Sequence, residues 1–252
     1  VFVLAGEDQF EIATFREESV YSDSRRPDDV KFSTIDKDVL RRDLTINALF
    51  YDIDKQQIVD LVGGVDDLKG GLIRTVGNAD DRFEEDRLRV LRAIRFACRL
   101  DFRLDNDIIK SIISNNSLKK VSNERIRSEF LSCIKSTTSA SRLRGLIKKF
   151  GLCEEMFPGL KLGEFTPVGN MNIQLAFALR ENSSKVLKKS LNKLTYTSDE
   201  INKICFLVDS INISEDNAFV MKKAFLKCKL NKGDLTIFHL LLKTDNDLII
   251  AF

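Results

Sequence analysis

The spacing of apolar residues changes near residue 80, from short runs typical of strands to a helical period that continues to the C-terminus. No proline occurs between Pro27 and Pro158, and proline is the residue that most strongly interrupts a helix. Strands are therefore confined to the first part of the chain. We expect an α+β protein in which a small mixed α/β part is followed by an all-helical remainder.

The first part contains two predicted hairpins. Apolar runs place strands at 1–4, 10–15, 49–53, 58–61 and 72–76, with a short helix within 38–47 and a polar loop at 16–37. Glu11 shares a strand face with Ala13 and Phe15, where a carboxylate is either an edge charge or a metal ligand. Asp52 and Asp54 form an Asp-x-Asp triplet, which we interpret as part of a turn because it follows a strand end.

The remainder is predicted to be helical throughout. Helices are expected at 81–100, 105–115, 122–136, 139–150, 170–180, 183–194, 198–210, 216–228 and 233–243. In the 81–100 helix, Asp86 and Arg89 are three residues apart and share a face, which Arg92 and Arg95 continue. Two interpretations remain open: a salt-bridged surface, or a pocket in which a carboxylate and several guanidiniums bind a planar ligand.

Composition excludes several classes of chemistry. His239 is the only histidine and lies in an apolar segment, so a serine or cysteine hydrolase and a zinc site are not expected. The five cysteines are far apart, which indicates reduced thiols and a cytoplasmic protein. The net charge is +2, so any nucleic-acid surface must be local. No apolar run has the length of a membrane span, and no signal peptide is visible.

Asp86 and Arg89 would together distinguish between bases. An ionised aspartate only accepts hydrogen bonds and an arginine only donates them. Cytosine and adenine present an amino donor beside a ring-nitrogen acceptor, whereas guanine and uracil present the reverse order. The pair is therefore expected to bind CTP and ATP and to reject GTP and UTP.

Several segments then match a known family in order. They are 11–16 (EIATFR), 41–49 (RRDLTINAL), 60–68 (DLVGGVDDL), 85–89 (EDRLR), 122–126 (SNERI), and 151–152 with 157–158. Over residues 10–160 the chain resembles the class II tRNA nucleotidyltransferases (CCA-adding enzymes) and the bacterial poly(A) polymerases, within the polymerase-β-type nucleotidyltransferase superfamily. The resemblance fades after residue 160.

The resemblance implies a role for each matching residue. Glu11 would support a two-metal magnesium site, Arg42 would contact the triphosphate, and Asp43 and Asn47 would position the sugar. Asp86 and Arg89 would select the base, and Arg92 and Arg95 would bind phosphate or hold Asp86. The implied reaction is attack of a tRNA 3′-hydroxyl on the α-phosphate of CTP or ATP, without a nucleic-acid template.

The family's glycine-rich loop and metal-binding Asp-x-Asp precede the strand of Glu11, and neither occurs in this sequence. We therefore expect the chain to be inactive alone, and a homodimer and a complementing N-terminal fragment are the two alternatives for its protein partner. An A-adding enzyme, a poly(A) polymerase and a non-catalytic RNA-binding module remain as alternatives.

The resemblance also implies three parts. Residues 1–71 would be the N-terminally incomplete nucleotidyltransferase head, 72–137 the neck with the base-selecting helix, and 138–252 a body and tail that bind tRNA. Exposed lysines are the expected phosphate contacts. They are Lys148 and Lys149, Lys185, Lys188, Lys189 and Lys193, with Lys119 and Lys120 adding positive charge.

Overall fold

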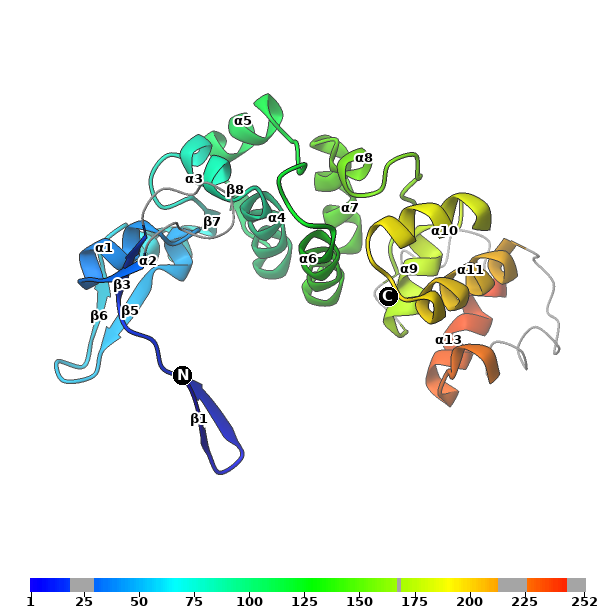
Figure 1. Ribbon diagram of the computed structural model, residues 1–252, viewed down its shortest axis with the longest axis horizontal. Coiled ribbons are helices and arrows are strands. Elements are labelled where there is room, and N and C mark those ends of the chain that lie inside the picture. Colours follow the sequence, from blue (N-terminus) through cyan, green and yellow to red (C-terminus); the bar gives the residue numbers. More distant parts are fainter. Residues whose placement is uncertain (19–29, 167–168, 213–225, 244–252) are drawn as a thin grey trace.

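The computed structural model describes residues 1–18, 30–166, 169–212 and 226–243. Figure 1 shows an elongated arch with the mixed α/β part at one end, a middle group of helices, and the C-terminal helices at the other end. The α+β class predicted from the change of period is confirmed.

The strands of the described residues form four separate pairs. Three pairs are antiparallel: β1 (Phe2–Ala5) with β2 (Asp8–Glu11), β3 (Arg16–Glu18) with β4 (Val30–Phe32), and β5 (Leu49–Asp52) with β6 (Gln57–Asp60). The fourth joins β7 (Leu72–Ile73) to β8 (Arg103–Leu104) in parallel. The predicted strand at 10–15 is thus wrong beyond Glu11, the one at 72–76 is shorter than expected, and the loop at 16–37 contains β3 and β4.

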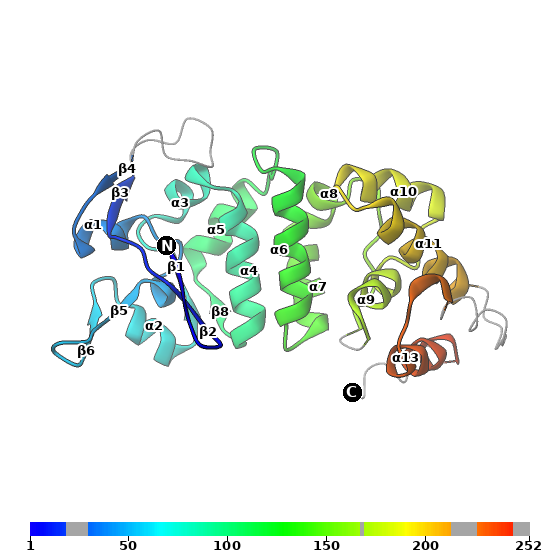
Figure 2. The same cartoon turned by 60° about the horizontal axis from the view of Figure 1, so that its bottom comes forward.

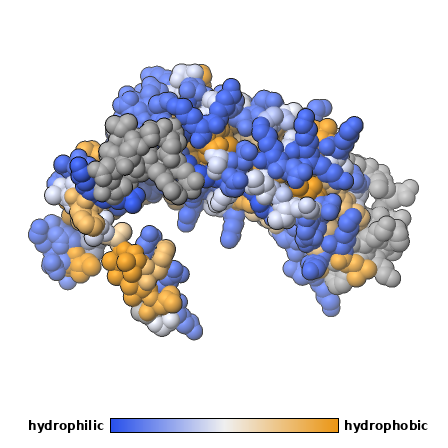
Figure 3. All heavy atoms as spheres, in the orientation of Figure 1, coloured by the Kyte–Doolittle hydropathy of each residue, from blue (hydrophilic) through white to orange (hydrophobic). Residues whose placement is uncertain are grey.

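The hairpin β1–β2 projects from the rest of the molecule, and apolar side chains cover it (Figure 3). Phe2 and Leu4 are 65% and 76% exposed. By contrast, the β5–β6 hairpin forms as predicted, and Asp52 stabilises its turn by accepting a hydrogen bond from the Lys55 amide (3.0 Å).

Two short helices replace the single helix predicted over 38–47. They are α1 (Ile35–Leu40) and the 3₁₀ helix η1 (Thr45–Asn47). The chain leaves the helix between them because Asp43 accepts from the Leu44 amide and the Thr45 amide bonds Arg74 O instead of a helical carbonyl.

A third short helix, α2 (Gly64–Gly70), was not predicted. The Asp60 carboxylate organises its start by accepting from the backbone amides of Val62, Gly63, Gly64 and Val65. Four donors at one carboxylate outweigh the effect of burial and lower the pKa of Asp60.

The remaining helices follow the predicted order. They are α3 (Ala79–Glu85), α4 (Leu88–Leu100), α5 (Asn106–Ser114), α6 (Asn123–Ser136), α7 (Ala140–Lys149), α8 (Leu152–Met156), α9 (Met171–Ala178), α10 (Ser184–Lys193), α11 (Ser198–Asn212) and α13 (Lys232–Lys243). Helix α8 was not predicted, and the helix predicted over 216–228 lies mostly outside the described residues. The helix predicted over 81–100 is two helices, α3 and α4.

One continuous core runs through the helices, from Leu44 in the head to Phe238 in α13. Helices α4 and α6 lie side by side at its centre (Figure 2). Among the described residues, no helix has the length and hydropathy needed to cross a membrane.

Candidate nucleotide-binding site

The break between α3 and α4 falls at Asp86, which was predicted to lie within one helix. Asp86 has an extended backbone (φ −150°, ψ 105°). Its carboxylate accepts from the Leu88 amide (3.1 Å), so it satisfies a free donor in the first turn of α4. A negative charge at this position also suits the positive end of α4. Asp86 and Arg89 therefore do not share one helical face.

Asp86 also forms a two-pronged ion pair with Arg125 of α6. Arg125 Nη2 lies 2.7 Å from Oδ2, and Nη1 lies 3.2 Å from Oδ1. Because both oxygens are engaged, the orientation of the carboxylate is fixed by α6 as well as by α4. Arg125 lay in a segment that matched the family, but no role was predicted for it.

Arg89 is buried and has different partners. Its Nη1 donates to Glu85 Oε2 (2.6 Å) and to Arg82 O (3.2 Å), and its Nη2 donates to Arg41 O (2.9 Å). Three of its five N–H groups are thus used within the protein, which leaves two for a ligand.

The predicted residues of the head and of α4 meet at an ion pair. Arg92 Nε donates to Asp43 Oδ2 at 2.6 Å, and Asn47 Nδ2 approaches Asp43 Oδ1 at 3.4 Å. Burial favours a higher pKa for Asp43, but the Arg92 guanidinium and the hydrogen bonds outweigh it and lower the pKa. Burial likewise favours a lower pKa for Arg92, yet Asp43 raises it. Both groups are therefore charged at neutral pH.

Arg42 is held beside this pair. Its Nε lies 3.2 Å from Oδ2 of the buried Asp38, its Nη1 donates to Asn47 O at 2.9 Å, and its guanidinium lies 4.6 Å from the centre of the Phe50 ring. Arg42, Asp43, Asn47 and Arg92 thus form one cluster.

Arg95 faces α6 rather than this cluster. Its Nε is 2.5 Å from Glu129 Oε1, and both side chains are largely buried. Glu129 was also not predicted. The segment that resembles the family, 122–126, ends three residues before Glu129.

Glu11 lies apart from the cluster, exposed at the end of β2 opposite Phe2. Within the described ranges, no three His, Cys, Asp or Glu residues are close enough to hold a metal ion together. These residues do not fit a metal site by themselves. The role of Glu11 as a metal ligand stays a prediction.

The predicted RNA-binding lysines are all exposed, on α7 and α10. Lys120 is exposed too, and its Nζ lies 2.6 Å from Glu84 Oε1. His239 lies in α13, as predicted, but its side chain is outside the described part.

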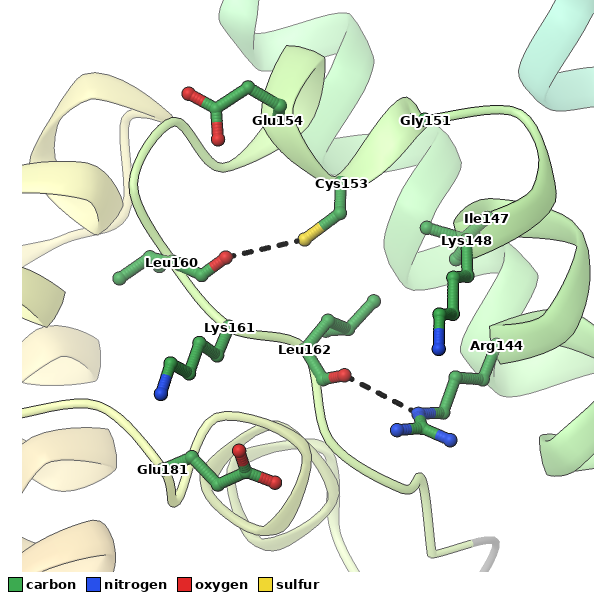
Figure 4. A pocket seen from close by; sticks show the side chains of 10 residues that line it. All are labelled: Arg144, Ile147, Lys148, Gly151, Cys153, Glu154, Leu160, Lys161, Leu162 and Glu181. Atoms are coloured by element: carbon green, nitrogen blue, oxygen red, sulfur yellow. Dashed lines mark hydrogen bonds between the residues drawn. The ribbon is translucent and has the colours of Figure 1, made fainter.

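A pocket of about 410 Å³ lies between α7, α8 and the segment 160–162 (Figure 4). Lys148 and Lys161 border it, and the Cys153 thiol donates to Leu160 O at 3.5 Å. Burial raises the pKa of that thiol, which keeps it protonated at neutral pH and unsuited to nucleophilic attack.

Comparison with known proteins identifies relatives of this chain. The family model described as "Poly A polymerase head domain" matches residues 1–74, and that described as "Probable RNA and SrmB-binding site of polymerase A" matches residues 101–162. A CCA-adding enzyme of Lactobacillus helveticus is 52% identical over 133 residues, which are 52% of this chain and 33% of that protein. The resemblance to the CCA-adding enzymes is thus confirmed over these parts of the chain.

A second relative shows the same similarity. The CCA-adding enzyme of Lactobacillus delbrueckii subsp. bulgaricus is 46% identical over 163 residues, which are 64% of this chain and 40% of that protein. The chain therefore spans between 33% and 40% of the length of these two relatives.

Solved structures match the fold. The crystal structure of the Bacillus stearothermophilus CCA-adding enzyme in complex with CTP has a TM-score of 0.72 and 23% identity, over 96% of this chain and 60% of that one. The Thermotoga maritima CCA-adding enzyme complexed with tRNA has a TM-score of 0.58 and 21% identity, over 84% of this chain and 58% of that one. The fold likeness thus extends beyond residue 162, where the family models end.

Proposed function

We propose that this chain is part of an enzyme that adds CMP and AMP to the 3′ end of tRNA, with protein side chains in place of a template. The observation that carries the proposal is the contact between two groups of residues in the site. The Asp43–Arg92 ion pair and the Arg89–Arg41 O hydrogen bond join the proposed triphosphate-binding and base-selecting residues. Relatives at 46% to 52% identity are CCA-adding enzymes, which supports the same reaction here.

In this proposal, Arg42 binds the triphosphate, and Asp43 and Asn47 position the sugar. Arg89 offers its two remaining N–H groups to the ring nitrogen and carbonyl of cytosine, or to the ring nitrogen of adenine. Asp86 accepts from the amino group, while Arg125 holds its carboxylate in place. Arg92 and Arg95 act through Asp43 and Glu129, and Arg125 is the arginine that pairs with Asp86.

We also propose the division into a head (1–71), a neck (72–137) and a tRNA-binding body and tail (138–252). We propose that the whole protein binds magnesium and that Glu11 is one of the ligands. We further propose a homodimer in which a second copy of the chain covers the apolar β1–β2 hairpin. The five cysteines are all free, which agrees with a cytoplasmic location.

The test uses the full-length native protein, tRNA lacking its 3′ end, magnesium and each nucleoside triphosphate in turn, with products sized on a gel. Addition of two C and one A is expected. Addition of A alone would indicate an A-adding enzyme, a long A tract a poly(A) polymerase, and RNA binding without transfer a binding module. Incorporation of all four nucleotides would contradict selection by side chains.

Asp86→Ala tests the selecting residue. Loss of its charge-assisted hydrogen bond should weaken CTP and ATP binding by about 10- to 150-fold, in line with about 1.5–3 kcal/mol for bonds to charged groups. Asp101→Ala, at an exposed position after α4, is the control. Equal affinities of Asp86→Ala and the parent protein for CTP and ATP would show that Asp86 does not select the base.

A further inference from the structure

Two arginines from successive helices bind the C-terminal end of α1. Arg82 Nη1 donates to Leu40 O at 2.6 Å, and Arg89 Nη2 donates to Arg41 O at 2.9 Å. These carbonyls lie in the last turn of a helix, where intrahelical donors are missing and the dipole favours cations. The residue that follows them is Arg42, so α3 and α4 are attached directly to the segment that carries the proposed triphosphate contact.

Glu85 connects the two arginines. One of its carboxylate oxygens pairs with Arg82 Nη2, and the other lies 2.6 Å from Arg89 Nη1. The side chains of Arg82, Glu85 and Arg89 are only 19%, 25% and 10% exposed. Charge-assisted hydrogen bonds shielded from water hold their geometry better than surface ion pairs do.

Arg82 keeps this position at a cost. Its Nε is buried and has no hydrogen-bond partner, and an unsatisfied buried donor is destabilising. Its two other nitrogens offset that cost because they bind two separate groups, Leu40 O and Glu85. Lysine has a single nitrogen and cannot reproduce both contacts with the geometry of a guanidinium.

We propose that Arg82 is a positioning residue for base selection: it locks Glu85 and the end of α1, so that Arg89 presents one rotamer to the base and stays in register with Arg42. The inference rests on the proposed function, because it assigns a consequence to the same site. Arg82 itself contacts no substrate. When Arg82 is lost, Glu85 has only Arg89 as a partner and α1 is free to shift relative to α4.

The experiment compares Arg82→Lys with Arg99→Lys in the full-length protein. Arg99 is exposed in the last turn of α4, so its variant makes the same chemical change away from α1. The readout is the ratio of kcat/KM for CTP over UTP on tRNA lacking its 3′ end. We expect the ratio to fall by about tenfold in Arg82→Lys, the scale on which misplaced groups affect rates, and to stay unchanged in Arg99→Lys. An equal loss of kcat/KM for both nucleotides would mean that Arg82 supports the structure without affecting base selection, which would overturn the inference.

Amide hydrogen exchange separates this inference from the proposed function. In Arg82→Lys, the amides of α1 should exchange faster than in the parent or in Arg99→Lys, because the helix has lost an anchor. This readout needs no catalysis. If the parent transfers no nucleotide but α1 exchanges faster in Arg82→Lys, the proposed function fails and the link between α3 and α1 stands. Unchanged exchange in α1 would overturn the inference whatever the activity.

Discussion

At the scale of single residues, four aspartates organise the mixed α/β part. Asp38 pairs with Arg41 and Arg42, Asp43 pairs with Arg92, Asp60 binds the start of α2, and Asp67 accepts from Thr45 Oγ1 (2.6 Å) and Arg74 Nε (2.9 Å). All except Asp60 are buried to about nine-tenths or more. Their charges are stable only with their partners, so the basic residues of the site are fixed by the fold before any ligand arrives.

Asp43 should make stability depend on pH in the acid range. Its pKa in the folded protein is lowered from 3.8. Its contribution is therefore present above pH 3.8 and is lost as the pH falls through the lower folded value. We expect urea unfolding at pH 6 to show Asp43→Asn to be less stable than the parent by about 3–5 kcal/mol, because Arg92 is left unpaired.

That difference between Asp43→Asn and the parent should shrink as the pH falls below 3.8. Asp107→Asn is the control, since Asp107 is 76% exposed and lies 3.5 Å from Lys110. A constant difference between pH 6 and pH 3 would mean that Asp43 does not titrate with the lowered pKa.

The residues of the site were largely predictable from sequence, but their partners were not. Arg42, Asp43 and Asn47 of one motif lie together, but the ion pair between Asp43 and Arg92 was not predicted. Arg125 and Glu129 were missed because they pair with Asp86 and Arg95 across 39 and 34 residues of chain. Spacing within one helix identifies neighbours three or four residues away, and it contains no information about the facing helix.

At the scale of elements, side chains that bond to the backbone set the boundaries that the apolar pattern missed. Asp86 ends α3 by binding an amide of α4, and Asp60 starts α2 by binding four amides. The segment 81–100 is rich in good helix formers, so propensity and period predicted one long helix there. The α2 segment begins and ends with glycine and contains two aspartates, so they predicted no helix there. Helices α5, α6, α7, α9, α10, α11 and α13 were predicted to within two residues at each end, whereas α4 starts seven residues after the predicted start.

Gly64 lets α2 approach η1 closely. A Cβ at this position would lie 2.2 Å from Thr45 O. Gly64→Ala should therefore push α2 away from η1 and lower the free energy of unfolding by about 1–3 kcal/mol or more, as overpacking does. Chemical denaturation would measure the change.

Gly70→Ala is the matched control, because Gly70 is in the same helix and a Cβ there meets nothing within 4 Å. Alanine at such a position gains up to about 1 kcal/mol through its helix propensity. A Gly64→Ala protein as stable as Gly70→Ala would show that α2 and Thr45 move apart at little cost in the free energy of unfolding.

At the scale of the whole molecule, a continuous core joins the part of the chain that the family models match to the helices that follow it. The family models end at residue 162, yet buried side chains continue without a break from α7 through α9, α10 and α11. Arg127 of α6 also reaches across to the later helices, with its Nη2 2.5 Å from Glu200 Oε1 and its guanidinium 4.1 Å from the centre of the Tyr196 ring. The middle and C-terminal helices of the arch are therefore packed together rather than joined by an open linker (Figure 2).

The net charge of +2 does not show that positive side chains are concentrated on α10. Lys185 and Lys189 are exposed one helical turn apart on α10, so they would reach neighbouring phosphates of a bound RNA. Replacing both by glutamine should weaken binding of tRNA lacking its 3′ end. Filter binding at several salt concentrations should show the slope of log K against log salt become shallower by about 1.4–1.8, as expected for two lost phosphate contacts. The same change at Lys55 and Lys69, exposed lysines of the head, removes equal charge without touching α10. Identical slopes for the two double variants would mean that α10 only contributes to the general field of the protein, and the tRNA would then have to follow another face of the arch.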